Sequence, residues 1–180
     1  MSLSLNFSVK NLWVSSCPNL LMVAALLAPI SIIASALFSF TVESLMPAGY
    51  TQAGSIRAIV EENKFGVGLV VSCLLIAPVI ENAICLLLVK GVMRWKSKRF
   101  WVKPLLVALT MGVIHSSIHS GVVDIRPFGV AIPFFIISSF IVNAEDKWCG
   151  YWSSVLHHSL YNSAIFLALL MPHVISRNGG

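Results

Sequence analysis

The sequence predicts an all-α fold, a polytopic membrane helix bundle of about five transmembrane helices with an interfacial segment after the first. Two observations predict this class. The chain of 180 residues is 57% hydrophobic and only 11% charged, whereas soluble domains contain about 45–50% apolar and about 25% charged residues. Its apolar residues form five stretches near the length of about 20 residues that crosses a bilayer. The composition argues against a soluble domain, a disordered chain and a nucleic-acid-binding protein, and it favours one membrane domain over residues 1–180.

The five expected spans follow one another along the chain. They are residues 19–40, 65–89, 104–121, 128–143 and 150–171. The first carries no charge and could be a signal-peptide core, but it is longer than such cores usually are, so we interpret it as a span. The third and fourth spans are short. Residues 41–64 join the first two spans on the outer side, and a stretch within them could form an interfacial or re-entrant helix.

The loop between the second and third spans predicts the orientation. It holds six basic residues and no acidic one, namely Lys90, Arg94, Lys96, Lys98, Arg99 and Lys103. Since the net charge of the chain is +5, all other residues together sum to −1. The positive-inside rule places this loop, residues 90–103, in the cytoplasm, with the N-terminus on the same side and the C-terminus outside. We interpret the loop as a topology signal beside anionic lipid, rather than as an RNA site or a peptide-docking patch.

The four cysteines carry no recognisable spacing. They are Cys17, Cys73, Cys85 and Cys149. No CxxC pair occurs, and Cys73 and Cys85 lie within an apolar span. We therefore interpret the cysteines as small buried hydrophobic residues and expect no disulfide framework.

One acidic residue, Glu81, lies inside an apolar span. A charge at the bilayer centre costs roughly 2.5–3.5 kcal/mol on insertion scales, so such a residue is a functional candidate. At about 1.5 Å per residue from the cytoplasmic ends of the spans, the depths are roughly 14 Å for Glu81, 18 Å for His115, 12 Å for His158 and 18 Å for Asn162. His158 and Asn162 are four residues apart and share a helix face. Three helices are thus expected to bring these four side chains to one level.

This set of side chains is sufficient for hydrolysis of a peptide bond by water. Glu81, in an apolar pocket, can act as a general base near neutral pH, and His115 can orient the same water and shuttle its proton. His158 and Asn162 can donate hydrogen bonds to a developing oxyanion. The chain has no GxSxG and no HExxH motif, so it lacks the signatures of serine hydrolases and of zinc peptidases of the HExxH type.

Interpretations other than peptide hydrolysis apply to the neighbouring polar residues. For His119 and His157 we favour a hydrogen bond between helices over catalysis. His115 and His119 are four residues apart and could bind a divalent metal with Glu81 as third ligand, but we disfavour this and expect no cofactor. The acidic pair Glu61-Glu62 resembles a catalytic double acid, and we interpret it as a solvated surface.

The polar motifs resemble those of the CPBP family of intramembrane proteases, also called the type II CAAX prenyl endopeptidase or Abi family. That family carries EExxxR on one span, FxxxH on another and HxxxN on a later one. Here residues 77–82 read APVIEN, residues 111–115 read MGVIH, and residues 158–162 read HSLYN after the family-like GYWSS at 150–154. The similar region covers roughly residues 71–170.

The resemblance implies an intramembrane endopeptidase with a glutamate-dependent, metal-free mechanism. In the family, residues matching Glu81 and His115 activate water, and those matching His158 and Asn162 stabilise the oxyanion. The chain departs from the pattern at three positions, where Asn82, Leu86 and Met111 replace the second Glu, the Arg and the Phe. These departures leave open an alternative, a non-catalytic membrane binding or immunity protein of the same family. A third possibility, a proton-coupled transport subunit, is disfavoured because the chain has no repeat.

The resemblance also implies partners and location. We expect a peptide or membrane-protein substrate that reaches the site from the cytoplasmic side, contact with the lipid bilayer, and no nucleic acid. The short chain suggests a prokaryotic plasma-membrane protein, for which the family's usual assignment is bacteriocin processing or self-immunity.

Overall fold

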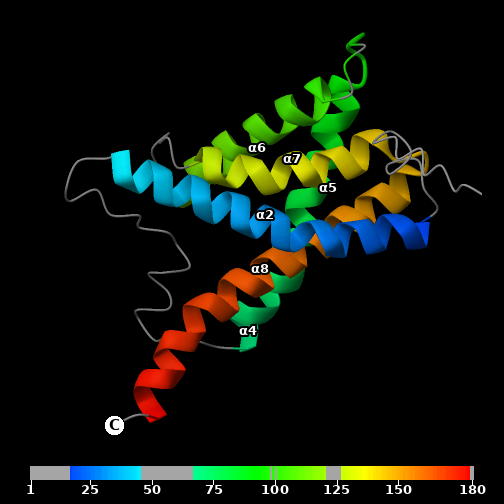
Figure 1. Ribbon diagram of the computed structural model, residues 1–180. Coiled ribbons are helices and arrows are strands. Elements are labelled where there is room, and N and C mark those ends of the chain that lie inside the picture. The colour runs from blue at the N-terminus through cyan, green and yellow to red at the C-terminus, as the bar shows by residue number, and fades with distance from the viewer. Residues whose placement is uncertain (1–16, 46–66, 98, 100, 121–126, 179–180) are drawn as a thin grey trace, which may run out of the picture.

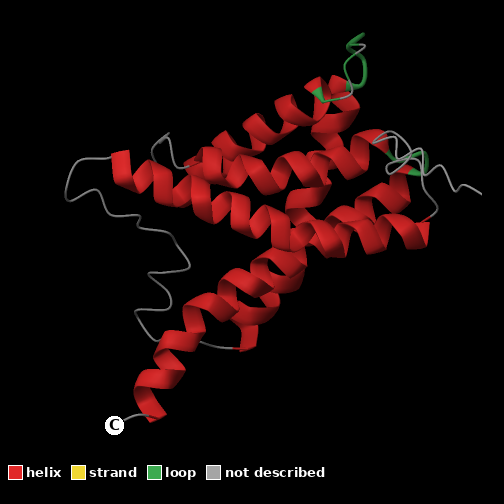
Figure 2. Cartoon of the chain, in the orientation of Figure 1, coloured by secondary structure: helices red, strands yellow, loops and turns green. Residues whose placement is uncertain are grey.

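The computed structural model describes residues 17–45, 67–97, 99, 101–120 and 127–178. Within these ranges every regular element is helical, as Figures 1 and 2 show, so the all-α prediction is confirmed there. The expected interfacial helix and the acidic pair Glu61-Glu62 lie outside the described residues.

Five helical stretches follow the order of the five expected spans. They are α2 (Cys17–Leu45), the continuous stretch of α4 (Val67–Val71), η1 (Ser72–Ile76) and α5 (Ala77–Val92), then α6 (Val102–Ser120), α7 (Pro127–Asn143) and α8 (Lys147–Asn178). Helix α2 continues past the expected span end at Phe40 to Leu45, and α8 continues past Met171 to Asn178. A fall in hydropathy ends an apolar span without ending helical hydrogen bonding.

Two helical segments in the described part are long and apolar enough to cross a membrane, Cys17–Phe38 and Ser72–Val92. Shorter apolar segments occupy Val102–His115 and Gly129–Asn143. The two long segments are only 33% and 22% buried, unlike the core helix of a soluble protein. One face of α2 is a continuous exposed apolar stripe formed by Met22, Leu26, Ile30, Ile33, Leu37 and Phe40. A stripe of this length requires apolar surroundings or a partner.

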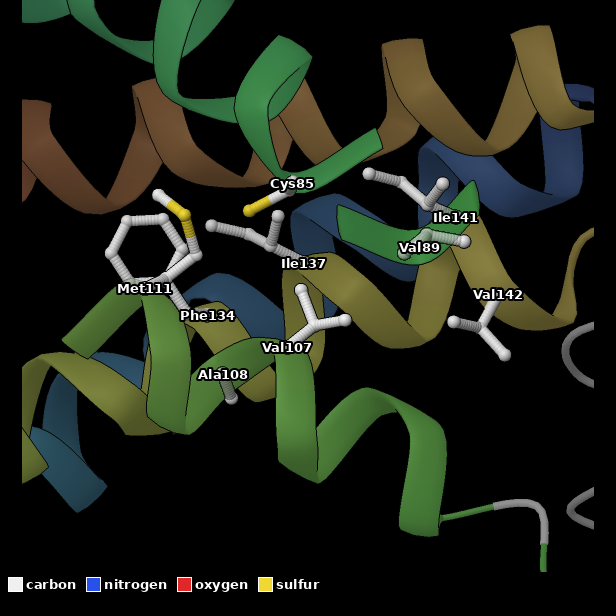
Figure 3. Packing of buried hydrophobic residues seen from close by; sticks show 9 residues of the cluster. All are labelled: Cys85, Val89, Val107, Ala108, Met111, Phe134, Ile137, Ile141 and Val142. Atoms are coloured by element: carbon white, nitrogen blue, oxygen red, sulfur yellow. The ribbon is translucent and has the colours of Figure 1, made fainter. Parts of the chain in front are cut away.

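Helices α5, α6 and α7 meet in one buried apolar cluster (Figure 3). Its members are Cys85, Val89, Val107, Ala108, Met111, Phe134, Ile137, Ile141 and Val142, and we call it the three-helix cluster. A second cluster joins α2, α7 and the start of α8 through Leu20, Ala24, Phe140, Ala144 and Cys149. Helix α7 contributes to both clusters and therefore lies at the centre of the bundle, while the C-terminal part of α8 extends away from it (Figure 1).

A proline in α7 explains one contact with α2. Pro133 lies inside α7, and proline has no N–H to donate to the carbonyl four residues earlier. That carbonyl belongs to Gly129, and it accepts a hydrogen bond from Oγ of Ser35 at 3.4 Å. The backbone group that the proline leaves free is thus satisfied by the neighbouring helix.

The first turn of α8 lies directly against α7. A Cβ atom built on Gly150 would lie 2.5 Å from the carbonyl oxygen of Phe140 and 2.8 Å from Cβ of Ala144. Only a glycine permits this approach, because the obstructing Phe140 atom is backbone and cannot rotate away. The glycine therefore decides how closely α8 packs at this end of the bundle.

The prediction that the cysteines form no disulfide is wrong. Cys17, at the start of α2, is bonded to Cys149 near the start of α8, with their Cα atoms 5.5 Å apart. The pair is separated by 132 residues, so no local spacing in the sequence indicates it. Cys85 is buried and free, as expected, and Cys73 is also free. The bond ties together two helices that already share the second cluster.

We predict that Gly150→Ala destabilises the protein by about 1–3 kcal/mol, the usual cost of overpacking. The matched control is Gly91→Ala, because a Cβ at Gly91 meets nothing within 4 Å. Each variant is unfolded by titrating the protein in mild detergent with a denaturing detergent. The difference between the two unfolding curves gives the difference in stability. Equal stability of the two variants would contradict the close approach of α8 to α7.

We also predict that a reductant lowers the melting temperature of the oxidised protein in detergent, since a disulfide contributes about 2–4 kcal/mol. The double variant Cys17→Ser/Cys149→Ser should melt at the same temperature with and without reductant, whereas Cys73→Ser should respond like wild type. A wild type that is shown by gel mobility to be oxidised, yet melts identically after reduction, would contradict a stabilising role for the bond.

Candidate active site

Glu81 lies on α5 between two imidazole rings that come from other helices. Its Oε2 atom is 3.9 Å from Nδ1 of His115 on α6 and 3.7 Å from Nε2 of His158 on α8. The Glu81 side chain is 22% exposed, and its buried Oε2 has no hydrogen-bond partner among the described residues. These separations are longer than hydrogen bonds. Three helices therefore bring one acid and two imidazoles to one point.

The helical turn that precedes α5 is a π-helix, and a proline explains the carbonyl that it leaves free. In η1 the N–H of Ala77 donates to the carbonyl of Ser72, five residues earlier. The next bond in this register would join residue 78 to Cys73, but Pro78 has no N–H. The carbonyl of Cys73 instead accepts a hydrogen bond from Nδ2 of Asn162 at 2.9 Å. Single π-helical turns of this kind are frequent at functional sites.

Asn162 therefore contacts η1, a structural role that its position in the sequence does not predict. Its amide group has two hydrogens, one of which is engaged by the Cys73 carbonyl. The other remains available to a second acceptor. Glu81, His115 and His158 are brought together directly, whereas Asn162 holds α8 against the turn that leads into the Glu81 helix.

His158 is buried and is held on two sides. Its Nδ1 lies 3.3 Å from Oδ1 of Asn82. Its ring makes an edge contact with Phe134, at 5.5 Å between ring centroids. The same Phe134 makes an edge contact with His115 at 6.2 Å. One aromatic side chain of α7 thus lies against both imidazoles and limits the orientations that their rings can take.

Three residues that shape this site are not predicted from the sequence. Asn82 is noted only as a departure from a family pattern, although a polar residue in an apolar span is itself a signal of a buried contact. Tyr151 donates a hydrogen bond to the carbonyl of Val79 at 3.0 Å and joins α8 to α5. Phe134 carries no signal, because a phenylalanine is ordinary in any apolar helix.

His157, the neighbour of His158, faces a different helix. It is fully buried, with Nδ1 3.0 Å from the carbonyl oxygen of Ala24 and Nε2 3.1 Å from Oγ of Ser31, both on α2. Both ring nitrogens are engaged, so no nitrogen is left to bind a substrate. This arrangement matches the expected hydrogen bond between helices.

Although Glu81, His115 and His158 lie close together, no three His, Cys, Asp or Glu side chains in the described part of the chain are arranged so that they could hold one metal ion. The metal alternative requires His119, which lies in α6 with its side chain outside the described set. Leu86, at the position where the family carries Arg, is partly buried against the three-helix cluster. Met111, one turn before His115, is buried within that cluster.

Comparison of the chain with protein-family models, with curated proteins and with solved structures finds no match.

We predict that Ser31 and His157 are energetically coupled. His157→Leu should cost about 2–4 kcal/mol, because a buried side chain and two hydrogen bonds are lost. Ser31→Ala should cost about 1 kcal/mol. The double variant should lose about 0.5–1.5 kcal/mol less unfolding free energy than the sum of the losses in the two single variants. Pairing His157→Leu with Ser163→Ala is the control, since within the described part of the chain the Ser163 hydroxyl donates only to the Ser159 carbonyl of its own helix. Full additivity at Ser31 would contradict the contact.

Proposed function

We propose that the protein is an intramembrane endopeptidase of the CPBP type, which hydrolyses a peptide bond with an activated water. The observation that carries the proposal is the position of the Glu81 carboxylate between the imidazoles of His115 and His158, at 3.9 and 3.7 Å. A partly buried acid beside two imidazoles, whose Oε2 atom has no hydrogen-bond partner among the described residues, is costly for stability, and such clusters are typical of sites that move protons.

In the proposed reaction, Glu81 accepts a proton from a water molecule that His115 helps to orient. The water oxygen forms a bond to the carbonyl carbon of the substrate peptide, and the carbonyl oxygen becomes an oxyanion. His158 is the proposed donor to this oxyanion, and the amide hydrogen of Asn162 that the Cys73 carbonyl does not engage is proposed as a second donor. Collapse of the intermediate breaks the C–N bond, and the leaving amine takes the proton that Glu81 removed from water.

The surface of the bundle supports a membrane location. The apolar stripe on α2 is exposed, and both long apolar segments are little buried within the protein. Lipid would cover these apolar surfaces without further protein. Trp95 and Trp101 are exposed beside the basic loop, and Trp148 and Trp152 are exposed at the start of α8, a placement typical of membrane interfaces. The substrate we propose is a peptide or membrane-protein segment that reaches Glu81 from the basic, cytoplasmic end.

The Cys17–Cys149 bond belongs to the same end of the bundle as the basic loop. The pKa of Lys147, two residues before Cys149, is lowered mainly by burial and also by the positive charge of Lys103. Lys103 is the last residue of the basic loop, so the disulfide lies near that loop. In the proposed orientation this end faces the cytoplasm, where thiols are kept reduced. The state of the pair in the cell therefore depends on the redox poise of that compartment.

A second candidate function is a non-catalytic binding or immunity protein of the same family. The replacement of the expected Glu–Arg pair by Asn82 and Leu86 favours it. Leu86 packs against apolar neighbours and Asn82 contacts His158, so neither residue can support the Glu81 carboxylate with a charge. Against this candidate, the three titratable groups that hydrolysis needs are present and adjacent.

The test is cleavage of a mixed pool of quenched fluorescent peptides by the full chain in detergent. We predict that Glu81→Gln and His115→Ala each lower the rate by at least about 10²-fold, because each removes a group that transfers the proton of the attacking water. Glu145→Gln, at an exposed position, is the matched control and should cleave like wild type. A chelator should leave the rate unchanged, and a loss of activity with chelator would favour the metal alternative.

Binding without cleavage by wild type, with equal binding by Glu81→Gln and His115→Ala, would contradict the protease proposal. That outcome would support the binding or immunity function.

A further inference from the structure

Asn82, the residue next to Glu81, is completely buried and contacts the second imidazole of the site. Its Oδ1 atom lies 3.3 Å from Nδ1 of His158. Its Nδ2 atom is buried with no hydrogen-bond partner among the described residues. Of the two polar atoms of the Asn82 amide, only Oδ1 therefore has a hydrogen-bond partner among the described residues, and that partner is a proposed catalytic histidine.

The orientation of the Asn82 amide indicates which nitrogen of His158 carries the proton. The amide oxygen faces Nδ1 and can only accept hydrogen bonds, so in this orientation Nδ1 of His158 is the donor. A neutral imidazole has one N–H, and Nε2 is then left with a lone pair. Nε2 is the atom that faces Oε2 of Glu81 at 3.7 Å.

We propose that Asn82 is a positioning residue that holds neutral His158 in its Nδ1–H form, so that Nε2 faces Glu81 as a proton acceptor. The catalytic consequence rests on the proposed function, whereas the protonation state of the ring does not. The edge contact with Phe134 at 5.5 Å restricts rotation of the same ring, so the amide and the phenyl group act on it together.

Stability alone does not account for an amide at this position. Leaving a buried Nδ2 without a partner costs free energy, and an apolar residue of similar size would avoid that cost. Cys85 and Val89, on the following turns of α5, are apolar and buried in the three-helix cluster. The amide is therefore explained by its contact with His158 rather than by packing.

The proposal orders the proton transfers of the reaction. The O–H bond of water breaks, its oxygen bonds to the peptide carbonyl carbon, and its proton goes to Glu81. The proton then moves from Oε2 of Glu81 to Nε2 of His158. Only the resulting imidazolium can donate an N–H from Nε2 to the oxyanion, and the same proton can pass to the leaving amine. His158 thus accepts a proton first and stabilises the oxyanion second.

The first measurement is ¹⁵N NMR of histidine-labelled full-length protein in detergent, with the His158 signals identified by their loss in His158→Gln. We expect Nδ1 of wild type to resonate as a protonated nitrogen and Nε2 as a nitrogen with a lone pair. The Nε2–H form in wild type would overturn the proposal without any variant at Asn82.

The matched variants are Asn82→Leu, which removes the acceptor, and Asn82→Asp, which keeps it. We expect Asn82→Leu to shift His158 to the Nε2–H form and to lower kcat about 10–100-fold with little change in KM, as is usual when a supporting hydrogen bond is lost. Asn82→Asp should keep the Nδ1–H form and recover most of kcat. An unchanged ring in Asn82→Leu would overturn the proposal.

The NMR and the cleavage assay separate two failures. If wild type cleaves no peptide but His158 is in the Nδ1–H form in wild type and not in Asn82→Leu, the positioning role stands and the protease function fails. If wild type cleaves peptide while His158 is in the Nε2–H form, the protease function stands and the positioning role fails.

Discussion

Hydrogen bonds from α8 side chains to main-chain carbonyls of other helices hold the site and the bundle together. His157 contacts Ala24 on α2, Tyr151 contacts Val79 on α5, and Asn162 contacts Cys73 on η1. The helices are apolar on most of their faces, so burial of apolar surface alone is compatible with many packings. Polar contacts between helices select one of them, because each has a single geometry that satisfies both partners.

Two prolines supply acceptors for these contacts between helices. Pro78 leaves the Cys73 carbonyl of η1 to Asn162, and Pro133 leaves the Gly129 carbonyl of α7 to a serine of α2. A free carbonyl buried among apolar groups must find a donor. A proline that interrupts the hydrogen bonding of its own helix therefore also provides the carbonyl that a side chain of a neighbouring helix binds. At η1 it does more, because Asn162 fixes α8 one turn before the helix that carries Glu81.

Much of the candidate site follows from position along the chain. Glu81 is conspicuous because it is a charge in an apolar span, and the number of residues from the cytoplasmic end of each span places His115 and His158 at a similar depth. Asn162 shares that depth, yet it bonds the Cys73 carbonyl, since counting says nothing about which backbone groups are unsatisfied. The role of Asn82 depends on the 3.3 Å approach of two side chains on different helices, which no spacing along either helix encodes.

The sequence by itself determined the helical class, the number and order of the helices within the described ranges, and the acid on which the functional proposal depends. These features are properties of single segments, because hydropathy and charge act locally. Only the tertiary structure decided the Cys17–Cys149 bond, the partners of His157 on α2, and the contact of Phe134 with both imidazoles. Those are contacts between segments far apart in the chain, and the packing of the helices creates them.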